Sequence, residues 1–165
     1  MNLFTKSILF GFLFLVFSCQ NMDENDKPII INSVLNPELE VEFRKKDLNA
    51  LYPKLITPQN FDAKRDTVLT RKIKTFQTEL VSGLKSEKIN WNVAESEISV
   101  LTRVYFDSIG RIEYFAFKVN NDEIKLKAME EFESVLEKNI SNLSLGIERE
   151  TKYNHCVNFK LPAEK

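Results

Sequence analysis

Hydrophobic and polar positions change their spacing several times along this chain, and each change predicts a different element. The first change is abrupt, because a run without charge from Ile8 to Phe17 is followed by the polar stretch 20–26. Between 20 and 40, prolines and polar residues interrupt short apolar pieces such as Ile29–Ile31, and no helical or strand period persists. The pattern predicts a tether over this second segment.

Regular structure is expected to begin near residue 40. Val41 and Phe43 alternate with charged residues, which leaves open whether a strand is added here. A short helical piece is expected to include Leu48 and Leu51. The folded domain is therefore expected to cover 41–165.

An amphipathic helix is predicted from about Asp62 to Leu84, because apolar residues recur there at spacings of three and four. Its expected buried positions are Leu69, Ile73, Phe76, Leu80 and Leu84. Lysine and arginine residues occupy much of the remaining helix surface, but the acidic residues Asp62, Asp66 and Glu79 reduce its net positive charge. We therefore interpret the cations as a solvated helix face and not as a site for an anionic partner.

A β-hairpin is predicted next, because from Ile98 the apolar period becomes two. One face of the first strand holds Ile98, Val100, Thr102, Val104 and Phe106, and the other holds Leu101, Arg103 and Tyr105. The residues Asp107–Gly110 form the expected turn, since glycine tolerates a positive φ. The second strand is expected over Arg111–Val119.

A second helix and a last strand complete the pattern. The helix is predicted over Glu123–Lys138, capped by the polar residues 120–122, with Ile124, Ala128, Phe132, Val135, Leu136 and Ile140 on one face. The strand is predicted over Lys152–Leu161, and Pro162 ends it. The fold class is therefore α+β: a helix packed on a small, mainly antiparallel sheet of three or more strands, preceded by an amphipathic helix.

The N-terminus has the layout of a secretory signal. Lys6 precedes the apolar run, and the small residue Ser18 follows it. The run is about ten residues long, whereas a helix that crosses a bilayer needs roughly twenty. Cys19 comes directly after the small residue, which resembles the signal of bacterial lipoproteins.

In the lipoprotein family the cysteine sulfur is lipidated and cleavage falls just before it. The resemblance thus implies a signal peptide over 1–18, lipidation of Cys19 and a tether over 19–40. A cleaved signal with a coincidental cysteine and an uncleaved anchor are the alternatives. The acidic residues Asp23, Glu24 and Asp26 resemble the export tags of Bacteroidetes lipoproteins, or they are a solvated linker. We expect a cell-envelope protein, lipid-anchored in the outer membrane on its periplasmic face or at the cell surface.

The order strand, turn, strand, helix, loop and strand over 99–162 resembles the C-terminal domain of TonB-type proteins. Its D-x-x-G-x-[IV] turn is met by Asp107–Ile112, and its F-x-L-P ending is met by Phe159–Pro162. The resemblance implies the fold and strand addition, in which a sheet edge pairs with an extended segment of another envelope protein. Energy transduction is not expected, because a lipid anchor cannot couple to a motor helix in the inner membrane.

Composition narrows the function classes. The chain has 165 residues, of which 147 remain after removal of 1–18, and this is enough for one domain. The formal charge is −1 and becomes −2 when Lys6 is removed, so no nucleic-acid partner is indicated. Hydrophobic residues make up 43% of the sequence, which is enough for a packed core.

Candidate chemistry is sparse. His155, the only histidine, precedes Cys156 on an alternating strand, so the two side chains would point to opposite faces and could not form a nucleophilic pair. Both are expected to be structural, and Cys156, left unpaired by the lipidation of Cys19, is expected to be buried. One histidine and one cysteine do not make a metal site, and no cofactor motif is present.

Two functions remain. Glu130, Glu131 and Glu133 are expected on the exposed side of the second helix, and Trp91 is expected in the core, so no catalytic constellation is indicated. We predict a lipid-anchored envelope lipoprotein that acts as a non-catalytic protein-interaction module. The alternative is a lipoprotein that binds a small ligand or glycan between helix and sheet, in a pocket lined by Phe115, Phe117 and Phe132.

Overall fold

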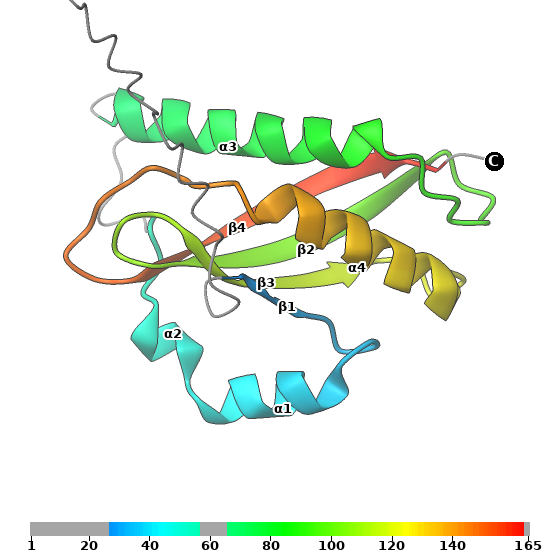
Figure 1. Ribbon diagram of the computed structural model, residues 1–165, viewed down its shortest axis with the longest axis horizontal. Helices are drawn as coiled ribbons and strands as arrows, with labels where there is room; N and C mark the ends of the chain where they lie inside the picture. The colour runs from blue at the N-terminus through cyan, green and yellow to red at the C-terminus, as the bar shows by residue number, and fades with distance from the viewer. Residues whose placement is uncertain (1–26, 57–65, 164–165) are drawn as a thin grey trace, which may run out of the picture.

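The computed structural model describes residues 27–56 and 66–163, which form helices packed on a mixed four-stranded sheet (Figure 1). The described elements, in chain order, are β1 (Ile29–Ile31), α1 (Pro37–Lys45), α2 (Leu48–Leu51), α3 (Thr67–Ser86), β2 (Glu97–Phe106), β3 (Ile112–Val119), α4 (Leu126–Ile140) and β4 (Tyr153–Pro162). The strand order is β1-β3-β2-β4, with β1 parallel to β3 and the other neighbours antiparallel. The predicted α+β class and the mainly antiparallel sheet are confirmed.

The predicted hairpin is formed by β2 and β3, whose register places Val104 opposite Phe115. Gly110 ends its turn with a φ of +89°, a conformation that favours glycine. A Cβ atom at this position would also lie 2.9 Å from the backbone nitrogens of Gly146 and Ile147. The turn therefore needs glycine both for its own conformation and for its contact with the loop between α4 and β4.

One face of the sheet is covered by α3 and α4 (Figure 1). The Phe132 ring of α4 is fully buried, with its centroid 5.3 Å from the Trp91 ring and 5.1 Å from the Phe117 ring of β3. Trp91 is 1% exposed, which confirms its expected place in the core. The side chains that α3 buries against this face are Ile73, Phe76, Leu80 and Leu84. This face holds the main core.

The opposite face is covered only at one end, by α1 and α2 (Figure 1). There the Tyr52 ring meets the rings of Tyr105 and Tyr114 edge-to-face, at centroid distances of 5.3 and 5.9 Å. Phe43 of α1 meets Tyr114 in the same way at 4.7 Å. These rings form a small second core, and none of the helices in 27–56 and 66–163 covers the rest of this face.

The tether predicted over 19–40 is wrong in its second half. Ile29–Ile31 form β1, which pairs with Tyr114–Ala116 of β3, and Ile30 and Ile31 are buried. Three residues are too few to show a period in the sequence, and only the neighbouring strand gives them a partner. The folded domain therefore begins near Ile29 and not at 41.

Two further expectations are corrected by the helices. Val41 and Phe43 belong to the helix α1, so no strand is added there; Phe43 is buried and Val41 is 52% exposed. The helix predicted from Glu123 begins at Leu126, with Lys125 as a cap residue that makes no side-chain hydrogen bond. The cap expected from 120–122 is not formed, because the Asn121 side chain accepts the Glu123 N–H within the preceding loop.

The remaining elements lie close to their expected ranges. The short helical piece around Leu48 is α2. The part of the helix predicted over 62–65 lies outside the described residues, and α3 runs from Thr67 to Ser86. Within the described ranges, no helix has the length and apolar character needed to cross a membrane.

Candidate binding surface on the open face of the sheet

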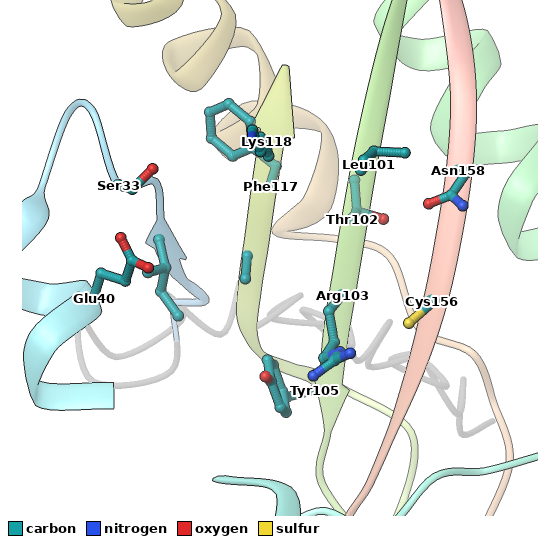
Figure 2. Close-up of a pocket in the computed structure, with 12 residues that line it drawn as sticks. Ser33, Glu40, Leu101, Thr102, Arg103, Tyr105, Phe117, Lys118, Cys156 and Asn158 are labelled. Carbon is teal, nitrogen blue, oxygen red and sulfur yellow. The ribbon is translucent and has the colours of Figure 1, made fainter. Parts of the chain in front are cut away.

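Polar and apolar side chains from three strands line the part of the sheet that none of the described helices covers. Leu101 and Arg103 come from β2, Lys118 comes from β3, and Cys156 and Asn158 come from β4 (Figure 2). The register places Leu101 opposite both Lys118 and Asn158, and it places Arg103 opposite Cys156. Alternation along the strands thus gathers these residues on one surface, which we call the open face.

The open face is hollowed. One concavity of about 450 Å³ lies over Leu101, Lys118 and Asn158, and a second of about 380 Å³ lies beside Phe43 and Leu48. The residues that line both of them are Ile31, Glu40, Arg103, Tyr105 and Ala116. The two concavities therefore join into one trough, with a sheet lobe and an α1 lobe.

Arg103 lies where the two lobes meet. The pKa of Arg103 is raised from its usual value, mainly by a side-chain hydrogen bond with Cys156. Burial opposes this shift, and Tyr105 adds to it. Across the trough, Glu40 accepts a hydrogen bond from the Nε atom of Arg44 at 3.1 Å, so α1 partly neutralises its own carboxylate. The Arg103 guanidinium therefore stays protonated at neutral pH.

The outer edge of β4 borders the open face. At its beginning the chain itself uses this edge: Asn154 donates to the Pro53 carbonyl at 2.9 Å, and Leu55 donates to the Asn154 carbonyl at 2.8 Å. Backbone groups alternate in direction along an edge strand, so those of Cys156, Asn158 and Lys160 also point outward. Within 27–56 and 66–163, these three residues take no backbone partner at that edge.

The other edge of the sheet is less accessible. It is formed by β1, which has three residues. The Asn36 side chain donates to the Ile30 carbonyl at 3.4 Å and to the Glu133 carboxylate at 3.2 Å, which ties this edge to α4. A partner strand would thus find a longer unpaired edge on β4 than on β1.

The structure separates the two residues expected to be chemically inert. His155 points to the helix-covered side, where burial lowers its pKa, and Cys156 points to the open face. Their opposite directions agree with the prediction that they do not form a nucleophilic pair. The expectation that Cys156 is buried is wrong: it is exposed, because none of the described helices lies over this part of the sheet.

The carboxylates of α4 lie mostly where expected. Glu130 and Glu131 are exposed, whereas Glu133 is half-buried beside Asn36, and this burial raises the pKa of Glu133. Among the residues that the structure describes, no group of three or more histidine, cysteine or acidic side chains is placed to hold a metal ion. Cys19, the predicted lipidation site, lies outside the described residues.

The pocket expected between helix and sheet is filled by its own lining. Phe115 and Phe132 are fully buried, Phe117 is 5% exposed, and the rings of Phe117 and Phe132 are in contact. The concavity lies instead on the opposite face, which the sequence reasoning missed. The sequence does place the polar residues Arg103, Lys118 and Asn158 at alternating positions of three strands. Sequence alone could not show which of these residues are neighbours in the sheet.

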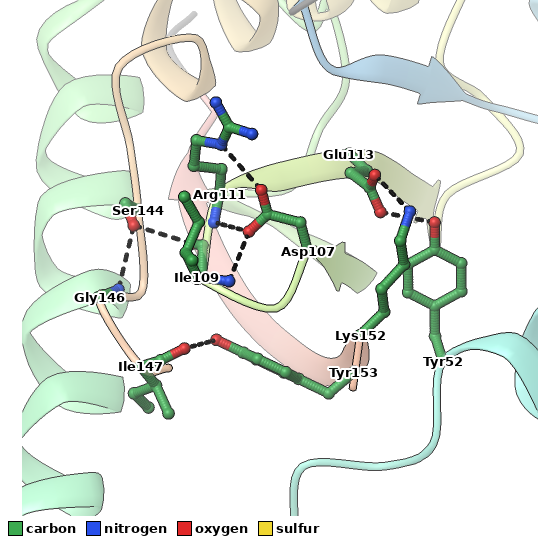
Figure 3. A network of polar contacts seen from close by, with 11 residues as sticks. Tyr52, Asp107, Ile109, Arg111, Glu113, Ser144, Gly146, Ile147, Lys152 and Tyr153 are labelled. Carbon is green, nitrogen blue, oxygen red and sulfur yellow. Dashed lines mark hydrogen bonds and ion pairs between the residues drawn. The ribbon is translucent and has the colours of Figure 1, made fainter. Parts of the chain in front are cut away.

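A polar network holds the hairpin turn and the end of the trough (Figure 3). The Asp107 carboxylate accepts hydrogen bonds from the N–H groups of Ile109 and Arg111 at 3.0 and 2.8 Å, and from Arg111 Nε at 2.8 Å. Although burial opposes it, this set of donors lowers the pKa of Asp107. These hydrogen bonds hold the Asp107–Gly110 turn, and all of them come from residues 109 and 111.

A second carboxylate orders the aromatic end of the open face (Figure 3). Glu113 accepts hydrogen bonds from the Tyr52 hydroxyl and from Lys152 Nζ, both at 2.6 Å. Burial and then Glu113 raise the pKa of Tyr52, so its hydroxyl stays a donor at neutral pH. The first network orders the hairpin turn, and the second ties Tyr52 and Lys152 to β3.

Comparisons of the chain with protein-family models, with curated proteins and with solved structures found no match.

Proposed function

We propose that this protein is a lipid-anchored lipoprotein of the cell envelope that acts as a non-catalytic protein-interaction module. The observation that carries the anchor is the sequence of its first nineteen residues, where Lys6, the apolar run, Ser18 and Cys19 stand in the order of a lipoprotein signal. A single acyl chain holds a protein only marginally, at about 0.8 kcal/mol per buried methylene. The several chains of a mature lipoprotein make the attachment stable.

The domain would stay close to the lipid surface. Because β1 begins at Ile29, only residues 20–28 separate the lipidated cysteine from the folded part. Nine residues span at most roughly 32 Å when fully extended. A binding surface on this domain would therefore meet partners in, or close above, the same membrane.

Interaction by strand addition is supported by the outer edge of β4. The chain already pairs one extended segment with this edge at Asn154, and the outward backbone groups of Cys156, Asn158 and Lys160 continue the same row. A partner segment could pair there through main-chain hydrogen bonds. The order β2, β3, α4 and β4 supports our further proposal that 99–162 is a TonB-C-like unit.

The alternative of a ligand held between helix and sheet finds less support. It would require Phe117 and Phe132 to separate, although their rings are in contact and Phe132 is fully buried. Opening a cavity of this kind costs several kcal/mol. We therefore place recognition on the open face and the β4 edge.

Metabolic labelling with an alkyne analogue of palmitate tests the anchor. The native chain should take up the label, and Cys19→Ala should lose it. The matched control is Cys156→Ala, which removes the other cysteine of the sequence and should keep the label. Label that persists in Cys19→Ala would refute the lipoprotein assignment. Protease treatment of intact cells then separates display at the cell surface from a periplasmic location.

Recovery of partners from envelope extracts tests strand addition. Asn158→Pro removes an outward N–H group, whereas the control Asn158→Ala keeps it. We expect the native chain and Asn158→Ala to recover the same envelope protein, and Asn158→Pro to lose it. Recovery that is equal for all three chains would contradict pairing at this edge.

A further inference from the structure

We propose that the outer edge of β4 selects a partner segment that places a large apolar side chain between Phe159 and the side of α3 that carries Val81. The inference deepens the proposed function and rests on it, because it names the chemistry of the segment that pairs with this edge. The partner is an extended segment of another envelope protein, in which polar and apolar residues alternate.

The helix α3 packs over β4, the strand at the edge of the sheet (Figure 1). At one end, the Phe76 ring of α3 lies 5.5 Å from the ring of Phe106, which pairs with Tyr153 at the start of β4. At the other end, Leu84 of α3 and Leu161 of β4 line one small hollow. The helix therefore follows the edge strand along its length.

The side of α3 that carries Val81 lies beyond the outer edge of β4. The opposite side faces α4 and the loop that follows it: Gly83 lies against Asn139 of α4, and Lys72 donates a hydrogen bond to the Gly146 carbonyl. At about 100° per residue, Val81 is turned about 160° away from Gly83 around the helix axis. Val81 therefore points away from α4, toward the space beside the edge strand.

Val81 is level with Phe159 along the edge. Val81 comes three residues before Leu84, a step of about 4.5 Å along a helix. Phe159 comes two residues before Leu161, a step of about 6.6 Å along a strand. Val81 is half-buried, and Phe159 is 9% exposed whereas Val157 and Leu161 are 1% and 2% exposed. Both side chains thus leave apolar surface at the outer edge, where an added strand would cover it.

The chain itself already pairs an extended segment with the start of this edge. Residues Pro53–Leu55 pair with Asn154, and the Leu55 side chain enters the main core, where it is 4% exposed. Leu55 is therefore an apolar residue that an edge-paired segment buries on the helix-covered side of the sheet. Among the described residues, none pairs with this edge at Asn158 or Lys160. A partner segment would do beside Phe159 what Leu55 does at the start of the strand.

Alternation along a strand sets the pattern of the segment. The partner residue opposite Phe159 points toward α3, so it should be large and apolar. Its two chain neighbours stand opposite Asn158 and Lys160, whose exposed side chains lie on the open face, so these neighbours should be polar. Because β4 pairs with β2 over ten residues without a shift in register, its outer edge is regular enough to accept such a segment.

Peptide binding to the full-length chain, purified in detergent micelles, tests the inference. The probe is the peptide Thr-Gln-Thr-Leu-Thr-Gln-Thr, whose pattern reads the same in both directions, and the control peptide has threonine in place of leucine. We expect the leucine peptide to bind about tenfold more tightly, because only leucine brings a large apolar side chain. In NMR spectra of the chain, the leucine peptide should shift the signals of the Val81 methyl groups and of the Asn158 and Lys160 amides.

Matched pairs of variants locate the contact. Val81→Thr replaces a methyl group with a hydroxyl at nearly the same shape, so it should weaken binding of the leucine peptide about threefold and leave the threonine peptide unchanged. The control Val68→Thr makes the same substitution at a position of α3 that is 63% exposed and should bind as the native chain does. Asn158→Pro should lose both peptides, and Asn158→Ala should keep them.

The outcomes separate the inference from the function on which it rests. Equal binding of the two peptides, or unchanged binding in Val81→Thr, would overturn the inference, and strand addition would stand if Asn158→Pro still loses both peptides. Binding that survives Asn158→Pro would refute pairing at this edge. The inference would also be overturned if neither peptide binds, or if the chain sediments as a dimer that excludes them, since a second copy would then occupy the edge.

Discussion

The two faces of the sheet differ in what covers them, although the same three long strands supply both. On the helix-covered face, Val100, Val104 and Phe115 are fully buried beneath α3 and α4. On the open face, Leu101 is 44% exposed and its neighbours are charged or polar. Burial of apolar area stabilises a fold at about 25 cal/mol per Å². The stability of the domain therefore comes mainly from the helix-covered face, and the open face contributes less to it.

The largest difference between the faces should appear on removal of a side chain. Phe132→Ala empties a fully buried site against Trp91 and Phe117, so we expect a loss of about 3–5 kcal/mol in the free energy of unfolding. Leu101→Ala on the open face should cost less than about 1 kcal/mol. Urea denaturation of the two variants measures both values. Equal losses would show that the open face is buried in solution.

Proline substitutions at two adjacent residues of β4 compare its inner and outer backbone hydrogen bonds. Val157→Pro removes an N–H that points to β2 and a buried side chain, so it should cost about 3 kcal/mol. Asn158→Pro removes an N–H that points outward and should cost less than about 1 kcal/mol, since edge strands tolerate proline there. Thermal unfolding compares the two variants. A severe loss in Asn158→Pro would mean that the β4 edge already has a partner.

A smaller effect concerns His155 on the helix-covered face. Burial lowers its pKa below the ordinary 6.5, so between these two values the unfolded chain binds more protons than the folded chain. Stability should therefore fall as pH drops below about 6.5, and the fall should end once pH is below the folded pKa. His155→Gln should lack this part of the pH dependence. Urea midpoints at pH 7.5, 6.5 and 5.5 for both chains test the sign, and identical profiles would contradict it.

The smallest effect is expected at Cys156, the next residue along and on the other face. Its side chain is exposed, so Cys156→Ser should change the free energy of unfolding by less than about 0.5 kcal/mol. In the native state the thiol should react with maleimide as fast as in the denatured chain. A thiol that reacts only after denaturation would place Cys156 in a buried interface.

Long periodic segments were predictable because their pattern is local. The alternation from Ile98 to Phe106 marked both faces of β2, and the turn residues Asp107–Gly110 marked the hairpin. The three residues of β1 and the start of α4 were not predictable. β1 exists only because β3 offers it a parallel partner, and the loop before α4 uses Asn121 for a local bond in place of a helix cap.

The candidate binding surface was likewise predictable only in part from the sequence. The sequence placed Leu101, Arg103 and Tyr105 on one side of a strand, but it could not show whether that side would be covered. The helices α3 and α4 pack on the opposite side, because the large apolar side chains of all three long strands point there. For this reason Cys156, expected in the core, lies on the surface.

By itself the sequence determined the α+β class and the alternation of each long strand, and it carries the N-terminal pattern on which the proposed lipidation of Cys19 rests. These depend on the order and spacing of residues, which act locally. Only the tertiary structure decided that Ile29–Ile31 join the sheet, that the described helices leave part of one face uncovered and that Leu101 lies between Lys118 and Asn158. Those outcomes depend on contacts between segments far apart in the chain, because strand pairing and helix packing decide which face of each strand is exposed to solvent.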